Sequence, residues 1–305
     1  MYNALLYLIT VFIWGSTWLA IKFQLGVVSP ELSIAYRFVL AATILFVFSF
    51  FRRLPLRFSP KSHAYFALQG LFLFSLNYFV VYLAEGYLTS GLVAIIFSII
   101  IMLNVLFGAV FLRNPIRLRV VLGALVGLLG LLFVFWPEIS PFDPSSQKVL
   151  GMSFAFIGTL SASLGNVVSA HNQRQKLPVV QTNAFGMLYG AIFMILLALI
   201  RGNQPQFDPS IGYMASLLYL AVFGSVIAFG SYLTLLGRIG LDRAAYVMIL
   251  FPIIALLLST LFEDLQWGVL QIMGVVLVLF GNAIVLTKTR WFKLPERVKR
   301  EPPLS

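Results

Sequence analysis

The chain has 305 residues, of which 60% are hydrophobic and 10% are charged, and its mean hydropathy is +0.97. Soluble domains contain about 45–50% apolar and about 25% charged residues, and this chain has too little polar surface to cover soluble cores. The composition therefore excludes a soluble enzyme, a disordered chain and a nucleic-acid-binding module, despite the formal net charge of +11. Cysteine is absent, which excludes disulfides, thiolate nucleophiles and cysteine-ligated metals.

Ten apolar stretches are long enough to form transmembrane helices, since a helix needs about 20 residues to cross a hydrocarbon core of roughly 30 Å. The first stretch has neither a basic region before it nor a small-residue cleavage site after it, so we interpret it as a retained helix and not as a signal peptide. The sequence predicts an all-α integral membrane protein with ten transmembrane helices. In chain order they are 4–22, 32–51, 64–86, 89–112, 118–136, 150–171, 180–200, 211–236, 243–262 and 266–287.

The basic residues predict the orientation of these spans, because cytoplasmic loops carry an excess of Lys and Arg. With the N-terminus inside, 17 of the 21 basic residues lie in the inner connections and the C-terminal tail, and seven of the ten acidic residues lie toward the outside. We therefore predict a multi-pass protein whose N- and C-termini are both cytoplasmic.

A weak internal repeat appears when the sequence is shifted against itself by 150 or 151 residues. Gly15 meets Gly165, and Gly130 meets Gly281. Each half then holds five spans, and an odd number forces the second half to enter the membrane upside down. Inverted repeats of this kind characterise secondary transporters, whose substrate site lies near the midplane between the halves. We predict two inverted five-helix repeats at 1–140 and 150–287, joined by a linker at 141–149 and followed by a basic tail at 288–305.

Three short segments resemble the EamA-type branch of the drug/metabolite transporter superfamily. They read FIWGST at 12–17, YRF at 36–38, and FPI at 251–253 followed by FE at 262–263. The resemblance covers the chain from Leu5 to Leu286 and implies export of small metabolites, with amino acids or related compounds as the cargo. The family often carries a Gly-Glu pair at the end of the fourth span, whereas this chain has Arg113 and Asn114 there.

The chemistry needed for other membrane functions is missing. The chain has no Gly-Lys pair and therefore no phosphate-binding loop of the GxxxxGK[ST] type. It holds two histidines and neither a nucleophile–base set nor a metal-ligand motif, so we expect no enzyme, no cofactor and no metal site. We predict a secondary transporter of a bacterial inner membrane that exports small metabolites by alternating access. A drug-efflux protein and a lipid-handling, flippase-like protein stay as alternatives.

Aromatic and polar residues within the spans form the candidate substrate site. Trp14 and Trp18 lie one turn apart on one face of the first span, and Trp14 falls near mid-membrane, away from the interfaces that tryptophan prefers. Each ring is either packed core or a stacking wall for a flat or cationic ligand. Ser16 matches Asn166 under the repeat, which places the two on opposite walls of one central site. The full set is Trp14, Ser16, Trp18, Asn77, Tyr78, Tyr82, Asn166, Tyr232 and Tyr246.

Charged residues inside spans are costly and usually mark a function or an ion pair. Lys22, Arg37 and Glu85 are predicted at similar depth near the outer side. Glu85 should pair with Arg37 or with Lys22, either as a stabilising clamp or as a gate that breaks when the halves rock. Glu85 and Glu263 are the protonation candidates if transport is coupled to protons, although facilitated diffusion or exchange is at least as well favoured.

Further features concern packing and partners. Pro252 should kink the ninth span and is a candidate hinge. Gly123 and Gly127 form a GxxxG pattern, which predicts close packing of the fifth span against another helix or a second subunit. We therefore expect a monomer or a weak homodimer. The basic tail should bind anionic lipid of the inner leaflet and not nucleic acid, which leaves a small-molecule substrate and membrane lipid as the expected partners.

Overall fold

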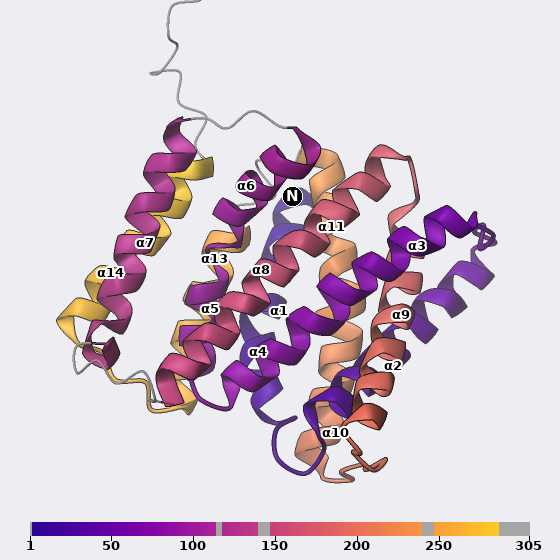
Figure 1. Cartoon of the computed structure of the whole chain (residues 1–305), viewed down its shortest axis with the longest axis horizontal. Coiled ribbons are helices and arrows are strands. Elements are labelled where there is room, and N and C mark those ends of the chain that lie inside the picture. Colours follow the sequence, from indigo (N-terminus) through magenta and orange to yellow (C-terminus); the bar gives the residue numbers. More distant parts are fainter. Residues whose placement is uncertain (1, 114–117, 140–146, 240–246, 287–305) are drawn as a thin grey trace, which may run out of the picture.

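The computed structural model describes residues 2–113, 118–139, 147–239 and 247–286. Within them, 7 helices are long and apolar enough to cross a membrane. Three shorter apolar helices, Val121–Trp136, Val247–Phe262 and Val269–Ile284, complete the ten predicted spans. The prediction of an all-α protein with ten membrane-spanning helices is thus confirmed (Figure 1).

Several spans are built from more than one helical segment. The third span is α3, η1 and α4, the fourth is α5 and α6, and the eighth is α10, η2 and α11. The first half contains α1 Tyr2–Lys22, α2 Pro30–Phe51, α3 Pro60–Gln69, η1 Gly70–Leu76, α4 Asn77–Glu85, α5 Ser90–Phe97, α6 Ile100–Leu112 and α7 Leu118–Ile139. The second half contains α8 Gln147–Arg174, α9 Val179–Ile200, α10 Ile211–Leu218, η2 Tyr219–Ile227, α11 Ala228–Ile239, α13 Val247–Phe262 and α14 Val269–Leu286.

Local sequence explains where the spans begin. Proline occupies the first turn of α2 and α3, where its missing N–H has no helical partner to lose. The side chains of Ser59 and Ser210 cap α3 and α10 by accepting the backbone N–H groups of Ser62 and Tyr213. Wherever the structure describes the residues concerned, the predicted span boundaries agree with the observed ones to within a few residues.

The helices of the two halves pack against each other in matching pairs. The first span contacts the eighth and ninth, and the sixth span contacts the third and fourth. Helix α2 packs along α9, and α7 packs along α14 at the opposite side of the bundle (Figure 1). The core therefore lies between the halves and not within each half alone.

Glycines create the close contact between α7 and α14. A Cβ atom added to Gly281 would lie 2.6 Å from the carbonyl oxygen of Gly123, and one added to Gly130 would lie 2.7 Å from the carbonyl oxygen of Gly274. The GxxxG pattern thus serves a helix pair within one chain, where the backbones approach too closely for any side chain. A second subunit is not needed to explain it.

Two π-helical segments occupy equivalent places in the two halves. A shift of 150 residues carries η1, Gly70–Leu76, onto 220–226, which falls inside η2, Tyr219–Ile227. π-Helical turns alter the backbone hydrogen-bonding pattern and are frequent at functional sites. The sequence analysis did not foresee them, because the apolar periodicity of these spans gives no sign of an inserted residue.

Candidate functional site

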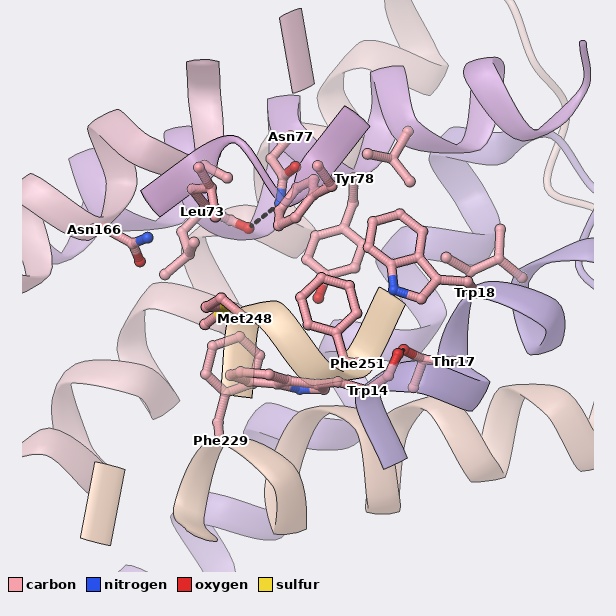
Figure 2. A pocket seen from close by; sticks show the side chains of 15 residues that line it. Trp14, Thr17, Trp18, Leu73, Asn77, Tyr78, Asn166, Phe229, Met248 and Phe251 are labelled. Atoms are coloured by element: carbon pink, nitrogen blue, oxygen red, sulfur yellow. Dashed lines mark hydrogen bonds between the residues drawn. The ribbon is translucent and has the colours of Figure 1, made fainter. Parts of the chain in front are cut away.

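A cavity of about 90 Å³ lies at the centre of the bundle, enclosed by helices of both halves (Figure 2). This volume is below the roughly 300–1,000 Å³ of pockets that hold drug-sized ligands, so the cavity as it stands fits only a small solute. Its walls are mainly aromatic and aliphatic. They consist of Trp14, Thr17, Trp18, Ile21, Leu73, Asn77, Tyr78, Val81, Phe97, Ile100, Ala162, Asn166, Phe229, Met248 and Phe251.

The two tryptophans of α1 are held by rings from several other helices. The Trp14 ring centroid lies 5.2 Å from that of Phe229, in an edge-on arrangement. The Trp14 indole N–H also donates to the Gly224 carbonyl in η2, at 3.3 Å. Trp18 lies edge-on to Phe97 at 5.1 Å. An indole offers a flat face, and these contacts fix the orientation of both rings. The two tryptophans therefore form a preorganised wall for an apolar group.

Asn77 offers a free acceptor at this site. Its side-chain N–H donates to the Leu73 carbonyl in η1 at 3.3 Å (Figure 2). Its Oδ1 is buried and has no hydrogen-bond partner among the described residues. A buried amide oxygen without a donor costs free energy. Asn77 therefore keeps an unused hydrogen-bond acceptor in the wall of the cavity.

Asn166 occupies another part of the cavity wall, away from Asn77 in the view of Figure 2. Its side-chain N–H donates to Asn104 Oδ1 at 3.2 Å, and Ser163 Oγ donates to the same oxygen at 2.9 Å. Asn104 of α6, which is not itself part of the cavity lining, therefore fixes the orientation of the Asn166 side chain. An amide in an otherwise apolar stretch favours an interhelical hydrogen bond, and Asn104 accepts two such bonds from α8.

Arg37 of α2 is buried beside this cavity, with 1% of its surface exposed. Its Nε donates to Ser225 Oγ in η2 at 3.1 Å, and its Nη2 is 3.4 Å from the Tyr78 hydroxyl. The guanidinium carbon lies 4.5 Å from the centre of the Tyr78 ring. The sequence predicted Arg37 or Lys22 as the ion-pair partner of Glu85, and Arg37 forms no ion pair with it among the described residues.

Lys22 joins two carboxylates just beyond the cavity. Its Nζ lies 3.8 Å from Glu85 Oε2 and 3.4 Å from Glu263 Oε1, and it donates to the backbone carbonyls of Glu85 and Leu88. Lys22 follows the cavity residue Ile21 directly. The two ion pairs therefore lie next to the cavity along α1, and we call Lys22, Glu85 and Glu263 the charged cluster.

Glu263 ties the ninth span to the start of α5. Its carboxylate accepts the Ser90 backbone N–H at 3.0 Å, the Ser90 hydroxyl, and the Ser259 hydroxyl at 2.6 Å. A carboxylate at a helix N-terminus satisfies backbone N–H groups that have no helical acceptor. Glu263 was predicted as a protonation candidate but not as a member of the ion-pair set. Its place three residues before the tenth predicted span was the available signal.

A neutral network joins the halves toward the opposite end of the bundle. Gln69 Nε2 donates to Asn183 Oδ1 at 2.9 Å, and Asn172 Nδ2 donates to Gln69 Oε1 at 3.0 Å. All three side chains are buried. The ion pairs of the charged cluster therefore join the two halves at one end of the bundle, and hydrogen bonds between side-chain amides join them toward the other.

The predicted substrate residues separate into three groups. Trp14, Trp18, Asn77, Tyr78 and Asn166 line the cavity together. Ser16 does not, because two residues turn a helix by about 200° and so point it away from Trp14. Its hydroxyl instead bonds the carbonyl of Phe12 at 2.7 Å and the hydroxyl of Tyr219 at 2.6 Å.

Two further predicted residues lie outside the cavity lining, and the last of the set lies outside the described residues. Tyr82 is buried above Tyr78 on α4, and Tyr232 packs behind Trp14 with ring centroids 5.1 Å apart. Tyr246, like the basic tail at 288–305, lies outside the described residues. Pro252 lies inside the continuous helix α13, next to the cavity residue Phe251, and its role as a hinge stays a prediction.

Comparison with known proteins decides the family. The model of the EamA-like transporter family matches residues 1–136 and 149–287, which is nearly the whole chain in two consecutive segments. The chain belongs to the EamA-like transporter family. It is therefore a multi-pass membrane protein of a transporter family, and the resemblance noted in the sequence is confirmed.

Two bacterial relatives align with nearly the whole length of this chain at low sequence identity. It is 27% identical over 287 residues to YedA of Escherichia coli K12, named an uncharacterized inner membrane transporter, and covers 90% of each chain. It is 24% identical over 270 residues to the uncharacterized transporter YoaV of Bacillus subtilis, covering 88% of this chain and 91% of YoaV. A solved crystal structure shares the fold with a TM-score of 0.67 and 20% identity, covering 92% of this chain and 95% of the other.

Proposed function

We propose that this EamA-like protein exports small amphipathic metabolites, foremost amino acids or related compounds, across a bacterial inner membrane by alternating access. The observation that carries the proposal is the central cavity, which helices of both halves enclose and which combines an aromatic wall with the free Oδ1 of Asn77. An aromatic wall suits an apolar side chain, and a free acceptor suits an ammonium group.

The moving parts in this proposal are the two five-helix halves, 1–140 and 150–287. Two arguments support them: the two family matches fall on the same segments, and the two π-helical segments are related by the 150-residue shift. The charged cluster joins Lys22 and Glu85 of the first half to Glu263 of the second. It would be the gate at the outer side, where the distribution of Lys and Arg places it if both termini are cytoplasmic.

Counterflow in proteoliposomes tests the proposal. Purified protein is reconstituted with a high internal concentration of one unlabelled amino acid, and entry of the same radiolabelled amino acid is followed for a panel that includes aromatic and branched members. We expect transient accumulation of label for at least one of them, and none in liposomes without protein. Absence of counterflow for the whole panel would overturn the proposed substrate class.

Lipid handling is the alternative that one observation favours. A second hollow of about 270 Å³ lies between α2, α9 and the η2–α11 segment, and Phe229 lines both this hollow and the central cavity. Most of its lining is apolar, as a site for an acyl chain would require. The same proteoliposomes, loaded with headgroup-labelled lipid, distinguish the two functions: scrambling of labelled lipid without amino-acid counterflow would favour the alternative.

A further inference from the structure

Arg37 carries a positive charge that no described carboxylate balances. The ion pairs among the described residues are Lys22 with Glu85, Lys22 with Glu263, and Arg201 with Glu31. Arg37 belongs to none of them, although it is almost completely buried. A buried cation normally has an anionic partner, because burial removes the water that would otherwise stabilise its charge.

The neutral contacts of Arg37 satisfy only part of its hydrogen-bonding capacity. A guanidinium has five N–H donors in a planar fork. Here Nε donates to Ser225, Nη2 makes a long contact with the Tyr78 hydroxyl, and Nη1 has no hydrogen-bond partner within the part of the chain that the structure describes. The Tyr78 ring adds a cation–π contact. The hydroxyl of Tyr82 also faces the guanidinium and interacts with it, as a further neutral neighbour that brings no negative charge.

Only one layer of side chains separates this guanidinium from the cavity. Tyr78 contacts Arg37 and also lines the cavity. Gly224 marks a second thin point, since a Cβ atom added there would lie 2.9 Å from Cγ2 of the cavity residue Thr17 and 3.3 Å from Nη2 of Arg37. A rotation of the Tyr78 side chain would therefore open a path from the cavity to the guanidinium.

We propose that Arg37 is the carboxylate-binding residue of the transport site and that the substrate is a carboxylate-bearing amphipathic molecule. The carboxylate would replace Tyr78 at the guanidinium fork, which matches its two oxygens in geometry and charge. The apolar part of the molecule would lie against Trp14 and Trp18, and Asn77 Oδ1 would accept an N–H where the molecule has one. This inference rests on the proposed function and narrows its substrate class.

Binding measurements with three phenyl probes of different charge test the inference. Phenylacetate carries a carboxylate, phenethylamine carries an ammonium group, and L-phenylalanine carries both. Equilibrium binding to the purified full-length protein is measured with radiolabelled probes. We expect the two carboxylate probes to bind at least tenfold more tightly than phenethylamine, because only they supply the missing anion.

Variants of Arg37 assign this preference to the guanidinium. Arg37→Gln should weaken binding of phenylacetate and L-phenylalanine tenfold or more and leave phenethylamine unchanged. Arg37→Lys should fall between Gln and the wild type, since it keeps the charge and loses the fork. Arg201→Gln is the matched control: it removes a guanidinium that already pairs with Glu31 Oε1 at 2.7 Å, and binding of all three probes should not change.

A purely structural Arg37, which only holds α2 against η2, would give a different result. Phenylacetate and phenethylamine would then bind alike, and Arg37→Gln would lower thermal stability without changing the preference for carboxylates. That outcome, or wild-type protein that binds neither carboxylate probe, overturns the inference. If Arg37→Gln does not fold, the wild-type comparison and Arg37→Lys still decide. The two proposals can fail separately. If carboxylate probes bind in a way that depends on Arg37 but no amino acid shows counterflow, the proposed transport function is wrong and the inference about Arg37 stands.

Discussion

Glu85 and Glu263 share one lysine, but their surroundings differ. Glu263 accepts hydrogen bonds from Ser90 and Ser259, and so its charge is stabilised by donors that need an acceptor. Glu85 is fully buried, and neither of its carboxylate oxygens has a hydrogen-bond partner among the described residues. Burial without hydrogen bonds destabilises a charge. The charge of Glu263 therefore stabilises the folded protein, whereas the charge of Glu85 destabilises it.

The two glutamates should consequently respond in different ways to the same substitution. Glu263→Gln places an amide N–H₂ against existing donors and should cost about 1.5–3 kcal/mol, the value of a hydrogen bond to a charged group. Glu85→Gln gives up the 3.8 Å ion pair with Lys22, which still pairs with Glu263, and removes a buried charge that has no hydrogen bonds. The variant should therefore be neutral or stabilising. Thermal unfolding of the purified variants in detergent measures both. The reverse order of stabilities would contradict the assigned roles.

At the cavity wall, Trp14→Ala and Asn77→Ala should each reduce counterflow without reducing the yield of folded protein. Trp14 supplies an aromatic surface, and Asn77 supplies the unpartnered Oδ1. Trp267→Ala is the control, because this tryptophan is exposed and bonds Thr260 outside the cavity lining. Unchanged counterflow in both cavity variants would remove the proposed site.

Among the secondary-structure elements, the π-helical segments link the fold to the site. Gly224 of η2 presents its carbonyl to Trp14, and Ser225 presents its hydroxyl to Arg37. Leu73 of η1 presents its carbonyl to Asn77. The altered hydrogen-bonding pattern of a π-helix leaves such backbone groups able to bond side chains. Both segments therefore orient side chains around the cavity.

The pair α7 and α14 depends on glycine instead. Gly281→Ala should destabilise the protein by about 1–3 kcal/mol or more, as overpacking does, because the new Cβ would meet backbone atoms of Gly123 and Gly127 at 2.6 Å. Gly230→Ala in α11 is the control: no atom lies within 4 Å of its added Cβ, and alanine is favoured over glycine in a helix by about 1 kcal/mol. Equal thermal stability of the two variants would contradict this account of the contact.

For the molecule as a whole, charge predicts which end faces the cytoplasm. The absence of cysteine makes a direct test simple, since any introduced cysteine is the sole thiol. Lys61 begins the third span and Gln204 precedes the eighth, and both are exposed. With cytoplasmic termini, a membrane-impermeant maleimide should label Gln204→Cys in intact cells, whereas Lys61→Cys should react only after permeabilisation. The opposite labelling pattern would reverse the orientation and make the charged cluster an inner gate.

The ten spans and some of the cavity lining follow from local sequence, because apolar length and helical spacing depend on near neighbours. Trp14 and Trp18 share a face for this reason, and both line the cavity. Ser16 was assigned by the repeat alone, and the helical turn of about 100° per residue points it elsewhere. Tyr82 shares a face with Tyr78 but packs one turn away from the cavity, a difference that no local pattern encodes.

Sequence by itself determined the membrane class, the number of spans, the family and the polar and aromatic candidates for the site. Tertiary structure decided which of them meet. Glu85 pairs with Lys22 and not with Arg37, Glu263 of the other half joins them, and Arg37 is left beside the cavity with an unpaired Nη1. The physical reason is that ion pairs and cavities form between helices distant in sequence, whose contacts depend on the packing of the entire bundle and not on the order of residues within any one span.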